Sequence, residues 1–157
     1  MSIPVADYCD TPDEQAKNPD ARRHFMEIAA GNMSAFNFMW TFWNFTHLYD
    51  DLVDNDKPVS VEQAARGIGQ LMEQLSFNPF YTSNMRAIFP HIMSTLNRWC
   101  DGEDWEQNGT ADQIKAASVV KCGDIDLYLN IAYLIGGWEH MRAMKHARSY
   151  DPIDRKE

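Results

Sequence analysis

The segment FNFMWTFWNFTHLYDDL, residues Phe36–Leu52, decides the fold of this chain. Aromatic residues follow one another so closely that an α-helix, which turns by about 100° per residue, carries them on opposite sides. One side carries Phe36 and Trp40. The opposite side carries Phe38 and Leu48. A helix that is apolar on both sides is buried, so the segment predicts an all-α fold built around this central helix.

The same helix ends in a cluster of acidic residues. His47, Asp50, Asp51 and Asp54 fall at i, i+3, i+4 and i+7, so they share one face. The carboxyl end of a helix carries a partial negative charge, and each carboxylate placed there costs roughly 0.3 to 1 kcal/mol. A compensating cation is therefore expected. Mg²⁺, or Mn²⁺ in its place, suits carboxylate ligands, whereas Lys57, an arginine from another helix or simple solvation is the structural alternative.

Composition limits the classes of partner. The chain has 157 residues, 45% of them hydrophobic, which is enough for one packed domain spanning 1–157. The formal net charge of −9 argues against nucleic acid and anionic membranes, because both are bound through excess lysine and arginine. No apolar run reaches the roughly 18 residues of a membrane span, and the first residues lack the basic region of a signal peptide.

The three cysteines, Cys9, Cys100 and Cys122, have no CxxC spacing. This argues against a disulfide framework and against a zinc motif. Reduced thiols in a cytoplasmic protein are the expectation.

Helix start and stop signals recur at intervals suited to a helical bundle. Residues 1–18 are expected to be partly extended. The first long helix should cover 19–30 and end at Gly31 and Asn32. Ser34 is the expected N-cap of the central helix, which should run to Asp54. Two capping boxes, in which a hydroxyl residue precedes a glutamine by three positions, open later helices. They are Ser60 with Gln63, and Thr110 with Gln113.

Proline and glycine mark the remaining boundaries. Pro79 follows an asparagine and fits the first position of a helix, whereas Pro90 predicts a kink or a split because proline lacks an amide hydrogen. The acidic stretch 101–109 is expected to be a loop, and the adjacent pair Gly136 and Gly137 to separate two helices within 111–145. Strand patterns are almost absent. The prediction is an all-α, single-domain bundle of five to seven helices.

A second group of candidate residues lies later in the chain. Lys121 and Asp124 are expected to share one face of a helix, with Tyr128 on the same side and Asp126 some 160° away. Only one of the two aspartates can face an interior site, and Asp124 is the better choice. Lys121 would then bind a phosphate and Asp124 a second metal ion, although an ion pair between the two is the simpler interpretation.

The stretch THLYDDLVDND, residues 46–56, resembles the first aspartate-rich motif of the all-α isoprenoid diphosphate synthases and class I terpenoid synthases. The resemblance implies that Asp50, Asp51 and Asp54 bind Mg²⁺ ions, which grip a diphosphate and help it leave as pyrophosphate. It covers about a dozen residues. Those enzymes carry a second metal-binding motif on a later helix, for which Lys121 and Asp124 are a partial counterpart.

The first hypothesis for function is a divalent-metal-binding helical protein with Mg²⁺-dependent chemistry on a diphosphate or another phosphorylated small molecule. A compact all-α nucleotide pyrophosphatase is the rival within this class. His47 and Lys121 are the candidate catalytic residues. The candidate metal ligands are Asp50, Asp51, Asp54 and Asp124.

Two further hypotheses remain open. The second is a non-catalytic protein that works through protein contacts, with Trp99, Trp105 and Trp138 as its interface and the Asp cluster solvated. The third is a histidine-aspartate metal phosphohydrolase. The last part of the chain is expected to form a basic helix with Arg142, Lys145 and Arg148. This helix is either solvated or in contact with another subunit, which leaves a homo-oligomer open.

Overall fold

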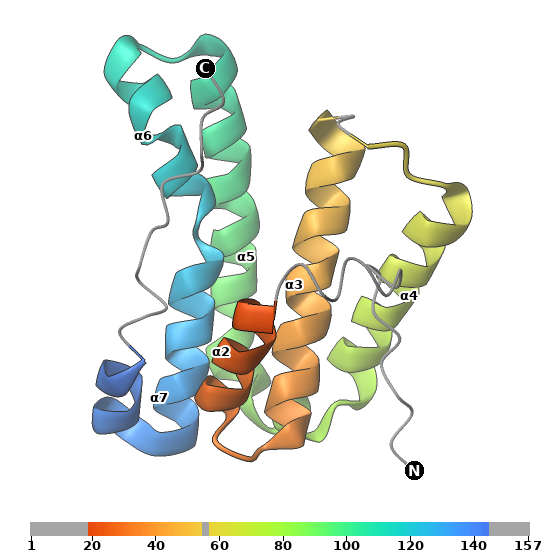
Figure 1. The fold of residues 1–157 in the computed structure, drawn as a ribbon, viewed down its shortest axis with the longest axis vertical. Coiled ribbons are helices and arrows are strands. Elements are labelled where there is room, and N and C mark those ends of the chain that lie inside the picture. The colour runs from red at the N-terminus through yellow and green to blue at the C-terminus, as the bar shows by residue number, and fades with distance from the viewer. Residues whose placement is uncertain (1–18, 55–56, 145–157) are drawn as a thin grey trace. The chain divides into compact units, whose positions relative to one another are not determined.

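The computed structural model describes residues 19–54 and 57–144, and Figure 1 shows the course of the chain. The described residues are mainly helical and contain no strand, so the predicted all-α fold is confirmed. The helices are α2 (Pro19–Ala29), α3 (Met33–Asp54), α4 (Val61–Phe77), α5 (Pro79–Asn108), α6 (Ala111–Lys121) and α7 (Asp124–Ala143). In these ranges no helix is both long enough and apolar enough to cross a membrane.

The chain forms two compact units, Met1–Met85 and Arg86–Glu157, which we describe in turn. That the chain is a single domain, as expected from its length, stays a prediction. The expected extended segment at 1–18 lies outside the described residues.

In the first unit, α3 is the central helix, and both α2 and α4 pack against it. Phe38, Met39, Phe42 and Leu48 are almost fully buried along it, and Phe36 and Trp40 on the other side are buried as well. The prediction that this helix is buried on both sides and ends at Asp54 is confirmed.

The expected capping boxes are formed. Ser60 and Gln63 exchange side-chain and backbone hydrogen bonds at the start of α4, and Thr110 and Gln113 do so at the start of α6. The predicted cap of α3 is wrong, because the side chain of Asn32 accepts the hydrogen bond from the Ala35 amide at 3.1 Å.

Two residues in the left-handed region end α2. Ala30 has φ 45° and Gly31 has φ 87°. Only glycine adopts such a backbone without cost, so the sharp turn into α3 depends on Gly31.

A glycine also lets α4 approach α3. A Cβ atom on Gly67 would lie 2.2 Å from Cδ2 of Leu48, which is itself buried. Any side chain at position 67 would therefore force the buried Leu48 side chain out of its place in the core.

In the second unit, the part of α5 that follows Met85 packs with α6 and α7 around an apolar core. The core side chains are Ile88, Ile92, Ala117, Leu127, Ile131 and Ala132. Helix α5 continues through Pro90, so the expected split at this proline is not found. Pro90 and Arg86, whose carbonyl loses its intrahelical donor, are both exposed, and water can therefore satisfy that carbonyl.

The acidic stretch predicted as a loop is helical, because α5 runs on to Asn108. Gly102 is not a turn residue. A Cβ atom there would lie 2.5 Å from Cγ of Lys121 and 3.1 Å from the carbonyl oxygen of Ala117, so Gly102 allows α6 to pack closely on α5.

The region 111–145 contains two breaks where one was expected. The predicted break at Gly137 is confirmed, since this residue has φ 70° and ψ −163° within α7. A second break separates α6, which ends at Lys121, from α7, which begins at Asp124. The prediction that Lys121 and Asp124 share one helix is therefore wrong.

Candidate functional site

The predicted metal cluster lies at the carboxyl end of α3. His47 is exposed, and its imidazole packs on Trp43 with the ring centroids 4.2 Å apart. Its Nδ1 donates to the Trp43 carbonyl oxygen at 2.9 Å. A neutral His47 bonded in this way carries its proton on Nδ1 and its lone pair on Nε2.

Asp51 has a cationic neighbour of the kind expected for a structural role. Lys57 Nζ lies 3.9 Å from Oδ1 of Asp51. The side chain of Asp51 is only 18% exposed and that of Lys57 is 66% exposed, so the carboxylate is partly withdrawn from water while its partner is not. Asp50 is half-buried, and the side chain of Asp54 lies outside the described residues.

Within 19–54 and 57–144, no three histidine, cysteine, aspartate or glutamate side chains come together in a way that could hold a metal ion. The fourth predicted ligand, Asp124, belongs to the other unit. A magnesium or manganese site at the end of α3 stays a prediction that depends on Asp54.

Lys121 is bound by carboxylates of its own unit. Its Nζ donates to Glu103 and, at 2.5 Å, to Glu106, and it lies 5.5 Å from the centre of the Trp99 ring. Burial lowers the pKa of Lys121, but the hydrogen bonds and charges of Glu103 and Glu106 outweigh it and raise the pKa overall. Lys121 therefore links α6 to α5 as a cation, and its proposed role in binding a phosphate stays a prediction.

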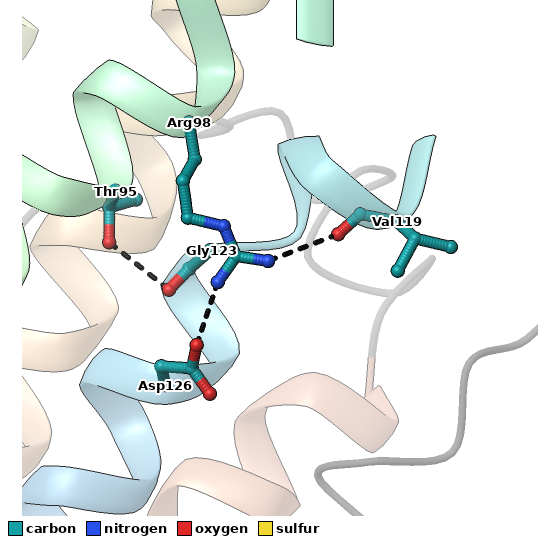
Figure 2. A network of polar contacts seen from close by, with 5 residues as sticks. All are labelled: Thr95, Arg98, Val119, Gly123 and Asp126. Atoms are coloured by element: carbon teal, nitrogen blue, oxygen red, sulfur yellow. Dashed lines mark hydrogen bonds and ion pairs between the residues drawn. The ribbon is translucent and has the colours of Figure 1, made fainter. Parts of the chain in front are cut away.

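Figure 2 shows the contacts that hold the junction of α6 and α7 on α5. Arg98 Nη1 donates to Oδ2 of Asp126 at 2.7 Å, and its Nη2 donates to the Val119 carbonyl oxygen at 3.4 Å. The hydroxyl of Thr95 donates to the Gly123 carbonyl oxygen at 3.2 Å. These contacts fix where α7 begins.

The two aspartates of α7 differ as expected. Asp126 is exposed and paired with Arg98, whereas Asp124 is half-buried. Burial and then the charge of Asp124 raise the pKa of Tyr128 well above its ordinary value. The same two causes raise the pKa of Cys122, so this thiol stays protonated at neutral pH and is a poor nucleophile.

The second unit also has an open pocket of about 430 Å³ that the motifs did not indicate. Its polar residues come from α5 and α7, and they are His91, Ser94, Asp126, Asn130 and Tyr133. The size suits a small molecule. Two of its polar groups already have intramolecular partners, because Asp126 binds Arg98 and Asn130 donates to the Ala87 carbonyl oxygen at 3.3 Å. No sequence motif connects the α5 residues of this pocket with its α7 residues.

Helix α4 has a second apolar face that is not packed against α3. Val61 is 88%, Ile68 47% and Met72 62% exposed. Together with the exposed Ala65 and the half-buried Leu75, they are spaced by 4, 3, 4 and 3 residues. We call Val61, Ala65, Ile68, Met72 and Leu75 the α4 stripe. The sequence analysis missed it, although its spacing is visible in the sequence.

The tryptophans proposed as an interface fare differently. Trp138 is 60% exposed. Trp99 and Trp105 are half-buried, and Trp99 lies against Lys121. Of the three tryptophans, only Trp138 is as exposed as the residues of the α4 stripe.

Comparison of the chain with known protein families, with curated protein sequences and with solved structures gave no match.

Proposed function

We propose that this chain is a non-catalytic helical protein that works by contact with another protein, and that the α4 stripe is its binding surface. The observation that carries the proposal is the exposure of Val61, Ile68 and Met72 along one face of a regular, capped helix. With ordinary side-chain areas, the stripe exposes on the order of 400 Å² of apolar surface, the size of the largest patches on monomeric proteins, which are often functional.

Methionine supports the same proposal. Met26, Met33, Met72, Met85 and Met93 are each at least two-fifths exposed. The flexible, polarisable thioether adapts to different partner surfaces, and exposed methionine is typical of binding faces. Lys121, one of the two candidate catalytic residues, is held by Glu103 and Glu106 instead.

The test uses the chain as bait with extract of the cells that encode it, followed by affinity measurement with each purified partner. Ile68→Asp should weaken binding at least tenfold, because a carboxylate in the centre of an apolar interface loses its hydration. Ile114→Asp is the matched control, since Ile114 on α6 is 44% exposed against 47% for Ile68. Equal binding by the two variants would count against the proposal.

A divalent-cation site at the end of α3 is the second candidate function. It is favoured by the carboxylate of Asp51, which is largely withdrawn from water at the negative end of a helix with only the exposed Lys57 described near it. Together with Asp50 and Asp54 it would hold Mg²⁺ or Mn²⁺, and through the ion a phosphorylated small molecule. His47 and Lys121 as catalytic residues remain hypotheses.

This second candidate is tested by thermal melting with and without Mg²⁺ and pyrophosphate. A ligand that binds the native state alone raises the melting temperature. The rise should disappear in Asp51→Asn and persist in Asp112→Asn, a control carboxylate in the first turn of α6. Melting curves that the ions leave unchanged would exclude the site.

A further inference from the structure

We infer that the α4 stripe pairs with the α4 stripe of a second copy of this chain, antiparallel, about a two-fold axis at Ile68. The inference rests on the proposed function and names its partner. The first argument is the spacing of the stripe, because alternating steps of 4 and 3 residues keep apolar side chains on one seam between two helices that cross at a shallow angle.

The stripe is complementary to itself. In an antiparallel pair centred on Ile68, Val61 of one copy faces Leu75 of the other. Ala65 faces Met72, and Ile68 faces its own counterpart. Each outer layer therefore combines a smaller with a larger side chain, which is how facing helices fill the space between them. A contact in which the same patch serves both copies is the ordinary geometry of a homodimer.

Gly69 provides an independent argument. Glycine in the middle of a helix lowers its stability relative to alanine. Gly67 has an intramolecular reason, since its absent Cβ makes room for Leu48, but nothing lies within 4 Å of a Cβ on Gly69. Gly69 is next to Ile68 at the proposed axis and flanks the stripe, where a missing side chain lets a second backbone approach.

The area agrees with this pairing. The two stripes and their polar margins would bury on the order of 1,200 Å², at the lower limit for specific interfaces. We expect an interface at this lower limit to give a weak dimer that dissociates in the micromolar range. Added salt should strengthen it, because each copy carries a net charge of −9.

Sedimentation equilibrium of the full chain measures this association directly. The wild type should change from monomer to dimer over micromolar concentrations. Ile68→Asp should remain monomeric, and Ile114→Asp should dimerise like the wild type. Gly69→Ala should raise the melting temperature of the monomer and yet weaken dimerisation several-fold, a combination that a purely local effect on helix stability does not produce.

Cross-linking tests the geometry. In a background where Cys9, Cys100 and Cys122 are replaced by serine, Ile68→Cys should form a disulfide with its counterpart at the axis. Val61→Cys should not, since the antiparallel pair separates the two copies of position 61 by about 20 Å along the helix. Cross-linking of Val61→Cys as readily as Ile68→Cys would indicate a parallel pair and overturn the arrangement.

Three outcomes overturn the inference. One is a monomer at every concentration, and another is a dimer that survives Ile68→Asp. The third is a full chain that is monomeric but dimerises once residues 1–17 are deleted. That result would mean that the chain's own first segment, and not a second copy, binds the stripe. If the chain is monomeric but Ile68→Asp still abolishes binding of another protein, the proposed function stands and this inference alone fails.

Discussion

Ser34 and Asn78 are joined by a reciprocal pair of hydrogen bonds. The hydroxyl of Ser34 donates to Oδ1 of Asn78, and Nδ2 of Asn78 donates to the Ser34 carbonyl oxygen, both at 2.8 Å. Oδ1 of Asn78 also accepts from the Tyr81 amide at 2.9 Å. One buried side chain thus fixes the first turn of α3 to the junction where α4 ends and α5 begins.

Asn78→Ala should therefore lower the free energy of unfolding by about 2 to 4 kcal/mol, because it leaves several buried donors and acceptors without partners. Asn97→Ala is the control. Asn97 also makes a side-chain hydrogen bond, to Asp101 at 2.9 Å, but at an exposed position, where about 0.5 kcal/mol or less is expected. Urea denaturation followed by circular dichroism gives both values, and similar losses would contradict the role assigned to Asn78.

The two glycines of α4 should respond in opposite directions to the same substitution. Gly67→Ala places a Cβ atom 2.2 Å from Leu48 Cδ2, and overpacking of this kind costs about 1 to 3 kcal/mol, more than alanine's helix propensity returns. Gly69→Ala meets no atom within 4 Å and should stabilise the monomer by about 0.5 to 1 kcal/mol. Denaturation at concentrations below dimerisation measures both, and a shift of the same sign in both would refute the packing argument.

Lys121→Met tests the cation that α6 presents to α5. The substitution keeps the apolar stem but leaves Glu103 and Glu106 facing each other without a counter-charge. A loss of about 1 to 3 kcal/mol at pH 7 is expected. Lys115→Met is the control, because Lys115 is exposed and lies 3.8 Å from an almost fully exposed Asp112, and such pairs contribute little.

The pKa of Lys121 determines how the stability lost in Lys121→Met should depend on pH. Because the folded protein raises the pKa of Lys121 above its ordinary value of 10.5, the stabilisation by this cation is complete below that pH and is lost as the pH rises through the folded pKa. The deficit of Lys121→Met should therefore be constant from neutral pH to about pH 10 and shrink above it. A stability difference between Lys121→Met and the wild type that disappears near pH 7 would show that Lys121 titrates there. That result would support Lys121 as a catalytic candidate.

Local signals in the sequence located the helix starts that depend on a few adjacent residues. The capping boxes at Ser60 and Thr110 and the break at Gly137 are all as predicted, because each is determined by backbone groups within one turn. The central helix was also foreseen, since the aromatic content of 36–52 leaves it only a buried position.

Features that depend on distant residues were not foreseen. Gly102 was placed in a loop because the structural reason for this glycine, the close approach of Lys121, lies 19 positions away. Lys121 and Asp124 were placed on one helix although Gly123 lies between them, because a single glycine is tolerated within a helical pattern. The contacts of Thr95 and Arg98 that fix the start of α7 come from α5. Tertiary packing overrides local propensity at such positions.

The network in Figure 2 leads to a last prediction, in which the longer contact matters more than the shorter one. Arg98 and Asp126 are 2.7 Å apart, but the Asp126 side chain is 64% exposed, so Asp126→Asn should cost about 0.5 kcal/mol or less and nothing at high salt. Thr95 is only 4% exposed, and its hydroxyl donates to the Gly123 carbonyl oxygen at 3.2 Å. Thr95→Val keeps the shape and removes that bond, which leaves a carbonyl oxygen without its donor and should cost about 1 to 2 kcal/mol at any salt concentration. Urea denaturation of both variants at low and high salt measures the comparison. A larger or salt-independent loss in Asp126→Asn would mean that the ion pair, and not the buried hydroxyl, holds the junction of α6 and α7 on α5.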